Sequence, residues 1–543
     1  MKVLIIGGVA AGTKVAAKLK REDRSCEVTM LTKSRDISYA GCGLPYYVGK
    51  VIPERGQLIV NTPDSFAGLT GVTVQTETEV TRVNPGDKTV EAKDLKTGKY
   101  STYSYDKLVI ATGADAIRPR IEGIDLENVF LMRTPDDAVA LRDAVEAGKI
   151  RRAVVVGGGF IGLEIAENLD VQGVRVTLVD MADQILPGFE KGLAEYAANH
   201  MIENGIMIFT NTPLEAITGE GKVAGVRAGG RNFKTDAVVL SVGVRPNTAF
   251  LADSGIELMP NRTIRTNEYL ETNIKDIYAV GDCAMVTNIL TRAPSWSPMG
   301  STANIAGRIA ATNIAGAREK RGYRGVLGTA VVKLPGLNAA RTGLTEADAA
   351  EAGYSPVSVV TVVDDKAHYY PDASIFIVKM VADRNTRKLL GLQVLGKGAV
   401  DKMADIAVTA MTLGATLDDV ANLDLSYAPP FSTAIHPFAH TVNILLNKID
   451  GAFETITPAA YANGEAKDYK VIDASTMPSI PGAPYLDLVK VEGEVPGYAK
   501  DEKLLLVCTR GKRAYMLQNR LKYYGYTNTL VLEGGTTVNE IEL

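Results

Sequence analysis

Residues 153–164, AVVVGGGFIGLE, pass from an apolar, largely β-branched run through three glycines into helix-forming residues. A strand that is buried on both faces of a parallel sheet has this kind of uninterrupted apolar run. Gly157, Gly159 and Gly162 have the G-x-G-x-x-G spacing, which permits a tight turn, the approach of a pyrophosphate and close packing of helix on strand. The stretch therefore predicts a strand, a phosphate-binding turn and a helix.

A second strand-like stretch, residues 174–179 (VRVTLV), follows this expected helix and precedes Asp180. A carboxylate about 20 residues beyond such glycines accepts hydrogen bonds from a ribose 2′-hydroxyl and repels a 2′-phosphate. Residues 181–183 (MAD) supply no arginine for that phosphate. We therefore expect this unit to bind NADH, with NADPH as the alternative.

The start of the chain repeats the pattern in residues 3–12, VLIIGGVAAG, with a helix expected at 13–20. Gly7 and Gly12 keep their places, whereas Val9 stands where the middle glycine belongs. Two strand–turn–helix units about 150 residues apart predict two nucleotide-binding domains of the α/β class. The N-terminal unit is interpreted as the FAD half.

Further strand-like runs end in small residues. Residues 108–113 (LVIATG) and 276–282 (DIYAVGD) have this form, and an acid at the end of the second run suits a contact with the ribityl chain or pyrophosphate of FAD. The residues expected to contact FAD are Gly7, Gly12, Ala111, Thr112, Gly113 and Asp282.

Composition excludes several classes of protein. The 543 residues include 59 basic and 63 acidic side chains, a net charge of −4 that is too balanced for a nucleic-acid or anionic-membrane binder. Four cysteines are too few for a disulfide scaffold and suit a reducing compartment, so a cytoplasmic protein is expected. No signal peptide, membrane span or metal site is predicted.

Several motifs together resemble the flavoprotein disulfide reductases that have two dinucleotide-binding domains. The two glycine turns, ATGA at 111–114, GVRPN at 243–247 and DIYAVGDC at 276–283 match that family in order and spacing over about residues 1–450. The resemblance implies that NADH reduces FAD from one face of the flavin ring and that the flavin reduces a sulfur centre on the other face. It also implies a homodimer.

The sulfur centre implied by the resemblance is Cys42, in SYAGCGLPY at residues 38–46. Glutathione-reductase-like members carry a second cysteine in a C-x4-C spacing, where this chain has Tyr47. A lone redox cysteine forms a mixed disulfide or persulfide with its substrate, or cycles through a sulfenic acid. The motif is similar to the subgroup of coenzyme A disulfide reductases, NADH oxidases and NADH peroxidases. The oxidases and peroxidases usually have a histidine where this chain has Ala10, which favours the first of the three.

Tyr369, in KAHYYP, and Tyr427, in SYAPPFS, lie 58 residues apart, as two tyrosines of that subgroup do. The resemblance implies that they hold and protonate a leaving thiolate, since a phenol donates a hydrogen bond without adding charge. Ser38, Lys18 and Arg21 are the expected contacts of coenzyme A; for the two basic residues, a solvated helix face explains their position equally well.

The segment after Pro430 departs from the subgroup pattern and reads STAIHPFAH. Its His436-Pro437 pair is similar to the acid/base segment of glutathione-reductase-like enzymes, which is contributed across the dimer. A catalytic role and a structural role of His436 both stay open. Cys26 and Cys283 are interpreted as structural, because neither lies in a turn suited to sulfur chemistry.

Near the end of the chain, VCTRGKRA at residues 507–514 resembles the C-x-x-G-x-R-[AS] active loop of rhodanese domains. The resemblance implies that Cys508 carries sulfane sulfur, supported by Arg510, Gly511 and Arg513. In such a loop the inward N–H groups, the arginines and the helix N-terminus all stabilise a thiolate or persulfide. A degenerate docking domain is the alternative.

The expected architecture is α/β, with two Rossmann-like domains, an α+β dimerisation domain and a rhodanese-like domain. Its boundaries are 1–115 and 245–325 for FAD binding, 116–244 for NAD binding, 326–450 for dimerisation, 451–467 for a linker and 468–543 for the rhodanese-like domain. The expected activity is NADH-driven, FAD-dependent reduction of coenzyme A disulfide, coenzyme A persulfide or polysulfide, with coenzyme A as substrate or bound shuttle. The alternative is an NADH oxidase that reduces O₂ through a Cys42 sulfenate.

Overall fold

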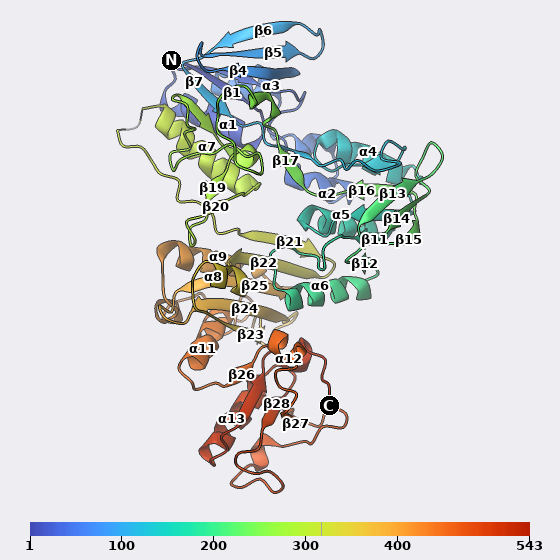
Figure 1. The fold of residues 1–543 in the computed structure, drawn as a ribbon, viewed down its shortest axis with the longest axis vertical. Helices are drawn as coiled ribbons and strands as arrows, with labels where there is room; N and C mark the ends of the chain where they lie inside the picture. Colours follow the sequence, from blue (N-terminus) through green and yellow to red (C-terminus); the bar gives the residue numbers. More distant parts are fainter. Residues whose placement is uncertain (317) are drawn as a thin grey trace. The chain divides into compact units, whose positions relative to one another are not determined.

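The computed structural model describes residues 1–316 and 318–543, which form two compact units (Figure 1). The first unit contains residues 1–187 and 202–326, and the second contains residues 188–201 and 327–543. Each unit combines helices with parallel and antiparallel sheets, so the mixed α/β class predicted from the sequence is confirmed.

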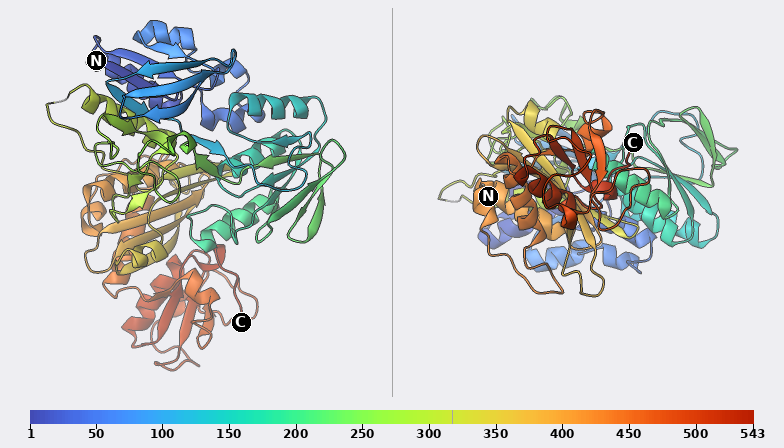
Figure 2. Two further views of the ribbon diagram at one scale, coloured as in Figure 1. Left: turned by 45° about the horizontal axis from the view of Figure 1, so that its top comes forward. Right: turned by 90° about the horizontal axis from the view of Figure 1, so that it is seen from below.

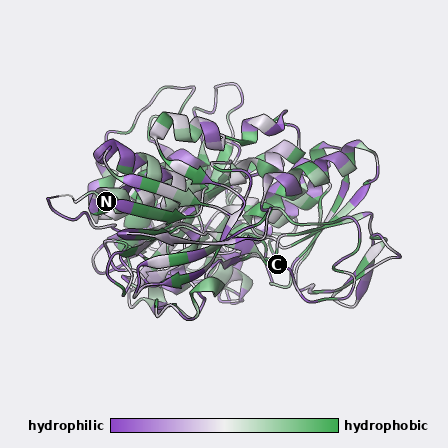
Figure 3. Ribbon diagram, turned by 90° about the horizontal axis from the view of Figure 1, so that it is seen from above, coloured by the Kyte–Doolittle hydropathy of each residue, from purple (hydrophilic) through white to green (hydrophobic). Residues whose placement is uncertain are grey.

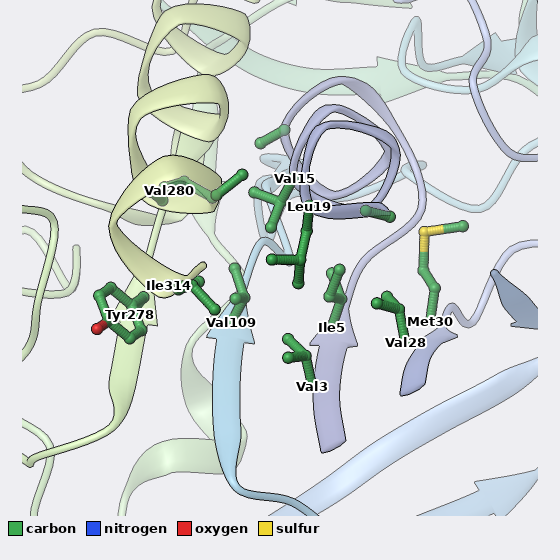
Figure 4. Packing of buried hydrophobic residues seen from close by; sticks show 14 of the residues in the cluster. Val3, Ile5, Val15, Leu19, Val28, Met30, Val109, Tyr278, Val280 and Ile314 are labelled. Carbon is green, nitrogen blue, oxygen red and sulfur yellow. The ribbon is translucent and has the colours of Figure 1, made fainter. Parts of the chain in front are cut away.

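The N-terminal glycine turn follows the central strand of a parallel sheet with the order β18-β7-β1-β2-β3. The strands are β1 (Lys2–Ile6), β2 (Glu27–Leu31), β3 (Thr73–Gln75), β7 (Lys107–Ile110) and β18 (Ile277–Ala279). Helices α1 (Ala10–Glu22) and α7 (Gly300–Ile314) pack on this sheet, where Leu19 and Ile314 meet Ile5 and Val109 (Figure 4). Helix α1 begins three residues before the predicted start at residue 13, because the chain enters the helix within the glycine turn itself.

The second glycine turn follows β10 (Arg152–Val156), the central strand of a parallel sheet with the order β12-β11-β10-β16-β9. The remaining strands are β9 (Val129–Phe130), β11 (Arg175–Val179), β12 (Met207–Phe209) and β16 (Ala237–Leu240). Residues 153–156 and 176–179 include fully buried side chains from both faces of their strands, as continuous apolar runs predict. The strands expected from both runs are confirmed.

Smaller elements complete the first unit. Its antiparallel pieces are β4 (Thr78–Asn84), β5 (Thr89–Asp94), β6 (Tyr100–Ser104), β8 (Ala114–Ala116), β13 (Leu214–Thr218), β14 (Gly225–Ala228), β15 (Arg231–Lys234), β17 (Val244–Pro246), β19 (Val286–Thr287) and β20 (Pro294–Ser295). Its other helices are α2 (Leu44–Val48), α3 (Pro63–Thr70), α4 (Pro135–Glu146) and α5 (Phe160–Val171). Helix α6 (Lys191–Glu203) lies in the second unit up to Met201.

Residues 327–450 of the second unit form an antiparallel domain, whose sheet has the order β21-β22-β25-β24-β23. The strands are β21 (Ala330–Leu334), β22 (Leu337–Gly343), β23 (Pro356–Asp364), β24 (Ile375–Asp383) and β25 (Leu389–Gly396). The helices are α8 (Glu346–Glu351), α9 (Val400–Leu413), α10 (Leu417–Ala421) and α11 (Pro437–Ile449). Helix α9 packs on β22 and β25, and α11 packs on β23. The side chains of β24 and β25 are buried along both faces of the sheet.

The C-terminal domain, residues 451–543, is drawn in orange and red in Figure 2. It has a parallel sheet with the order β26-β29-β28-β27. The strands are β26 (Thr455–Ile456), β27 (Lys470–Asp473), β28 (Leu504–Val507) and β29 (Thr529–Leu532), with helices α12 (Pro458–Ala462) and α13 (Lys512–Tyr523). Residues 451–467 are therefore not the bare linker that we expected. They supply a strand and a helix, because Ile456 packs into the same core as Leu505 and Leu532.

One buried carboxylate joins the two domains of the second unit. The side chain of Glu533 is fully buried and accepts hydrogen bonds from Val360 N at 2.8 Å, Lys448 Nζ at 2.6 Å and Thr455 Oγ1 at 2.6 Å. A buried charge is stable only when it is paired and hydrogen-bonded. The C-terminal domain is therefore docked on the antiparallel domain by a fully partnered ion pair.

The helices carry both hydrophilic and hydrophobic residues, as helices that pack one face on a sheet do (Figure 3). Across residues 1–316 and 318–543, no helix combines the length and the apolar character needed to cross a membrane.

Candidate redox site and cofactor turns

In the first glycine turn, between β1 and α1, neighbouring backbone segments pack so closely that they leave no room for a side chain. Gly7 has a φ of +115°, and a Cβ there would lie 2.0 Å from the carbonyl oxygen of Ala111. A Cβ on Gly12 would lie 1.9 Å from the carbonyl oxygen of Gly7. Both positions therefore require glycine. Val9 has a φ of −105°, outside the left-handed region that favours glycine, so the middle position does not require glycine.

The second glycine turn repeats this construction between β10 and α5. Gly157 has a φ of +112°, and its Cβ would lie 2.3 Å from the carbonyl oxygen of Ser241. A Cβ on Gly162 would lie 2.0 Å from the carbonyl oxygen of Gly157. Apart from its chain neighbours and its own helix, no heavy atom of the described residues lies within 4 Å of the Cβ position of Gly159. The turn thus leaves open space at the glycine where a pyrophosphate is expected to approach.

Asp180 follows β11 and faces this second turn. One carboxylate oxygen accepts the N–H of Gly158, and the other accepts the N–H of Ala182 at 2.7 Å. Two backbone donors hold the side chain in one orientation at the end of the strand. The position suits the ribose contact expected of Asp180.

The helices that follow the glycine turns begin without a side-chain cap. Val9 and Gly159 are the N-cap residues of α1 and α5, and neither side chain satisfies the N–H groups of the first turn. By contrast, Thr134, Thr345 and Thr416 cap α4, α8 and α10. Uncapped N–H groups at a helix N-terminus bind phosphate. The two turns therefore fit the pyrophosphates of FAD and of NADH.

Hydrogen bonds and an ion pair hold two of the other residues expected at FAD, Thr112 and Asp282. Thr112 Oγ1 donates to the carbonyl oxygen of Asn247 at 2.7 Å, and Asn247 Nδ2 donates back to Thr112 O at 3.2 Å. The Asp282 carboxylate pairs with Arg133 Nη2 at 3.0 Å, and its carbonyl oxygen accepts Trp296 Nε1–H at 2.9 Å. The sequence did not indicate Arg133. Contacts of Ala111, Thr112, Gly113 and Asp282 with FAD stay predictions.

Cys42 lies in a short 3-10 helix, Gly41–Gly43, directly before α2, and it is exposed. Although the residue as a whole is exposed, its sulfur is partly desolvated, and this burial raises the pKa of the thiol. The carboxylates of Glu164 and Asp282 raise the pKa further, while Arg133 opposes them. The chain's own charges therefore favour the protonated thiol in the absence of substrate.

Glu164, in the first turns of α5, is the neighbour of Cys42 that sequence reasoning missed. The hydroxyl of Tyr46 donates to Glu164 Oε1 at 3.0 Å. Burial raises the pKa of Glu164 to about 7, with Glu167 adding to the rise and the Tyr46 bond opposing it. Its charge therefore changes near neutral pH. The only signal in the sequence is an acid two residues after Gly162, in the apolar first half of the helix.

We expect Glu164→Gln to lower the pKa of the Cys42 thiol, because it removes a negative charge that disfavours the thiolate. Alkylation of Cys42 at pH 8 should become about two- to five-fold faster, an effect of the size expected for a partly solvated charge pair. The measurement is the pH dependence of iodoacetamide labelling, with Cys42 followed by peptide mass. Asp170→Asn, further along the same helix, is the matched control and should leave the rate unchanged. Equal rates in the wild type and Glu164→Gln would contradict the assignment.

The expected coenzyme A contacts lie in different environments. Lys18 is paired with Glu22 one helical turn later, so its charge is already partly neutralised, whereas Arg21 is exposed. Ser38 has a φ of +48°, and its hydroxyl accepts from Asn61 Nδ2 at 3.4 Å. A role of these residues in binding coenzyme A stays a prediction.

Tyr47 occupies the position of the second cysteine in two-cysteine relatives and is 7% exposed. The guanidinium of Arg142 lies over its ring, 4.4 Å from the centroid. The residue therefore has a packing role and leaves Cys42 without a resolving thiol nearby.

Tyr369 and Tyr427, far apart in the sequence, are neighbours within the antiparallel domain. The Tyr369 phenol lies close enough to Tyr427 to raise the pKa of the Tyr427 hydroxyl. Both side chains are well exposed, and the ring of His368 stacks edge-on against Tyr369 with centroids 5.4 Å apart. The pair therefore offers two phenols to a ligand, although its catalytic role stays a prediction.

His436 is placed as a helix cap. Its Nδ1 accepts the N–H of Phe438 at 3.2 Å at the start of α11, and the side chain is 5% exposed. Burial, with a contribution from Lys402, lowers the pKa of His436 to about 4. The imidazole is neutral at pH 7, so this environment favours the structural role over that of a general acid.

Cys508 follows β28 and is 4% exposed. Its carbonyl oxygen accepts the N–H of Thr536 at 3.1 Å, and a Cβ on Gly535 would lie 1.8 Å from the same oxygen. Gly511, with a φ of +84°, is the N-cap of α13 and leaves the first turn uncapped. The expected order of strand, cysteine loop and helix is present. The uncapped N-terminus of α13 follows Cys508 within a few residues of the chain.

Both arginines of this loop have carboxylate partners. Arg510 Nη1 lies 2.7 Å from Asp364 Oδ1, at the end of β23. Arg513 Nη2 lies 2.9 Å from Asp487 Oδ1, and its Nε donates to the carbonyl oxygen of Ser475 at 3.2 Å. Carriage of sulfur by this loop stays a prediction.

The remaining cysteines lie in closed surroundings. Cys26 donates to Asp23 Oδ2 at 3.0 Å, and burial raises its pKa to about 11. Cys283 is completely buried, and burial raises its pKa as well. These environments suit the structural role expected of both.

Family models match most of the chain. Residues 1–308 match the pyridine nucleotide-disulphide oxidoreductases, and residues 329–439 match the dimerisation domain of that family. A relative from Methanocaldococcus jannaschii named NADH oxidase is 33% identical over 453 residues, which cover 83% of this chain and 99% of that protein. A relative from Pyrococcus horikoshii named NAD(P)H coenzyme A polysulfide/persulfide reductase is 33% identical over 450 residues, 82% of this chain and 98% of that protein.

Two solved structures are similar over nearly the whole chain. Reduced CoADR-RHD of Bacillus anthracis is 32% identical with a TM-score of 0.93, covering 99% of this chain and 97% of that one. An NAD-dependent persulfide reductase from A. fulgidus is 33% identical with a TM-score of 0.93, covering 99% of this chain and 100% of that one. The similarity therefore includes the C-terminal domain.

Proposed function

The chain belongs to the pyridine nucleotide-disulphide oxidoreductases, and from this membership we propose that it reduces coenzyme A disulfide, coenzyme A persulfide or polysulfide with NADH. The observation that carries the proposal is a single exposed cysteine, Cys42, with a packed tyrosine where a resolving cysteine would stand. A lone redox thiol must use a sulfur of its substrate as its partner. Relatives named for coenzyme A and for persulfide support that choice of substrate.

The residues divide the reaction between them. The first glycine turn and Asp282 would hold FAD, and the second turn and Asp180 would hold NADH; the flavin would supply the electron pair that reduction of the sulfur substrate requires. The Cys42 thiolate attacks a disulfide R–S–S–R, forms the mixed disulfide Cys42–S–S–R and releases R–S⁻. Two electrons and one proton then cleave the mixed disulfide to the Cys42 thiolate and R–SH. Tyr427, supported by Tyr369, provides the proton for the leaving sulfur.

We expect Tyr427→Phe to lower kcat with coenzyme A disulfide by about 10²-fold, the size usual for loss of a positioned general acid. The phenol that Tyr369 supports is absent in this variant, while the ring stays. Tyr370→Phe is the control, since it removes a neighbouring exposed hydroxyl that is outside the pair. The measurement is steady-state NADH consumption without oxygen. A Tyr427→Phe enzyme with wild-type kcat would remove the tyrosine from the mechanism.

The C-terminal domain carries a second sulfur function in this proposal. Residues 468–543 are assigned a rhodanese-like role in which Cys508 takes up sulfane sulfur and coenzyme A shuttles it to Cys42. Support comes from the cysteine loop, the uncapped N-terminus of α13 and the paired arginines. The proposal also assigns a role to each remaining part of the chain. Residues 1–115 and 245–325 bind FAD, and residues 116–244 bind NAD. Residues 326–450 form a homodimer, and the protein is cytoplasmic.

The test is anaerobic NADH consumption by the purified, FAD-loaded protein with coenzyme A disulfide, coenzyme A persulfide, polysulfide or no acceptor. Rapid turnover that requires a sulfur acceptor supports the proposal, and repetition in air measures any oxygen consumption. An NADH oxidase is the second candidate function, favoured by the similarity to the Methanocaldococcus jannaschii relative. Turnover only in air, independent of every sulfur compound, would decide for the oxidase.

A further inference from the structure

The Cys508 loop contacts the antiparallel domain as well as its own sheet. Arg510 is paired with Asp364 at the end of β23, and the Asn447 amide of α11 donates to the Tyr515 hydroxyl of α13 at 3.5 Å. His440 lies two helical turns before Asn447 on the same face of α11, close enough to Lys512 and Asp364 for both to affect its pKa. The surroundings of Cys508 are therefore built by two domains.

Most of the positive charge at this loop is neutralised. Asp364 pairs with Arg510, and Asp487 pairs with Arg513. Burial and Lys512 lower the pKa of His440, so its imidazole adds no charge at neutral pH. Among the residues that the structure describes, Lys512 is exposed and has no ion-pair partner. Lys512 and the dipole of α13 thus remain to attract an anion.

We infer that Asp364 sets the donor specificity of Cys508 by neutralising Arg510, so that the loop accepts sulfane sulfur from persulfides and disfavours dianionic donors such as thiosulfate. The inference rests on the proposed sulfur transfer at Cys508. An ion pair that belongs to the protein reduces the attraction of Arg510 for a second anion, and the remaining charge suits a donor that is neutral or carries one negative charge.

The two donors differ in the charge that they bring to the thiolate. With a persulfide, the Cys508 thiolate attacks the terminal sulfur of R–S–SH, the donor S–S bond breaks, and R–S⁻ leaves with the electron pair and Cys508–S–SH remains. With thiosulfate, attack on the outer sulfur breaks its S–S bond and releases sulfite with the electron pair. Both steps transfer one sulfane sulfur without an external oxidant or reductant. The thiosulfate step brings two negative charges next to the thiolate. It therefore depends more strongly on cationic side chains of the loop that are not already paired with carboxylates.

The experiment compares thiosulfate with pantetheine persulfide, a donor that resembles the reactive arm of coenzyme A and carries at most the single negative charge of its persulfide group. FAD-loaded, full-length protein carrying Cys42→Ser is incubated with each donor without oxygen, and persulfide on Cys508 is followed by alkylation and peptide mass. Asp364→Asn should raise the thiosulfate-to-persulfide rate ratio about five-fold, since the exposed ion pair is screened by solvent. This gain should shrink at high ionic strength.

Two further variants separate charge from structure. Asp450→Asn removes an exposed aspartate that pairs with Arg387 at 2.6 Å in the same domain, and the ratio should not change. Asp364→Asn combined with Arg510→Gln removes both charges and should restore the wild-type ratio within two-fold. If Cys508 takes up sulfur but the thiosulfate-to-persulfide rate ratio is the same in the wild type and in Asp364→Asn, the inference is overturned and the proposed transfer stands. No sulfur on Cys508 from either donor overturns both.

Discussion

Cys42→Ser should reduce anaerobic NADH turnover with coenzyme A disulfide by about 10³-fold or more, since it removes the nucleophile of the reaction. Cys26 and Cys283 cannot take its place because both are buried, and Cys508 belongs to the second unit, whereas both glycine turns belong to the first. Reduction of bound FAD by NADH should persist, because both glycine turns are unchanged. The measurement is NADH consumption in the steady state, with the flavin spectrum recorded after one equivalent of NADH.

Cys26→Ser is the matched control for this prediction. Its thiol is hydrogen-bonded to Asp23 and buried, so a serine keeps the donor and should leave turnover within two-fold of the wild type. A Cys42→Ser enzyme that retains full disulfide turnover would contradict the proposed mechanism.

Glu533→Ala should destabilise the docking of the C-terminal domain by about 3–5 kcal/mol, the usual cost of removing one partner of a buried ion pair. The substitution leaves Lys448 with the carbonyl oxygen of Ser358 as its remaining partner, and it leaves the Val360 N–H and the Thr455 hydroxyl without an acceptor. Hydrogen exchange of residues 451–543 should report the change directly, because this domain should open before the rest of the chain.

The exposed Glu540→Ala is the control for Glu533→Ala and should change stability by less than about 0.5 kcal/mol. Anaerobic reduction of coenzyme A disulfide should survive in Glu533→Ala, since the residues assigned to that reaction lie outside the C-terminal domain. Exchange rates equal to those of the wild type would show that the carboxylate does not hold the two domains together.

Local pattern was enough to predict the two nucleotide-binding units. A continuous apolar run, a glycine turn and a helix are determined by neighbours in the sequence, so β1, β10 and β11 were predicted almost to the residue. The start of α1 was placed too late, since sequence periodicity does not mark the point inside a glycine turn at which the helix begins. The short strand β26 was missed because two residues carry no periodicity.

A residue of the candidate site was predictable only where a short sequence motif indicates a reactive side chain. Cys42 and Cys508 stand in such motifs. Glu164 and Asp364 do not, because their importance comes from residues that the fold brings beside them, Cys42 in one case and Arg510 in the other. Tyr369 and Tyr427 are an intermediate case: the family spacing suggested the pair, whereas their proximity in space is set by the fold.

The place of β26 in the C-terminal sheet determines where the chain can be divided into fragments for expression. The polypeptide enters this sheet at residue 455 and returns to it at residue 470, so a border drawn at 467 would leave the edge strand on the wrong fragment. A protease that nicks the intervening residues 463–469 would produce two pieces held together by strand pairing and by the Ile456 core, without a peptide bond between them. Fragments for expression should therefore begin near residue 451, and even these would expose the carboxylate of Glu533 to solvent.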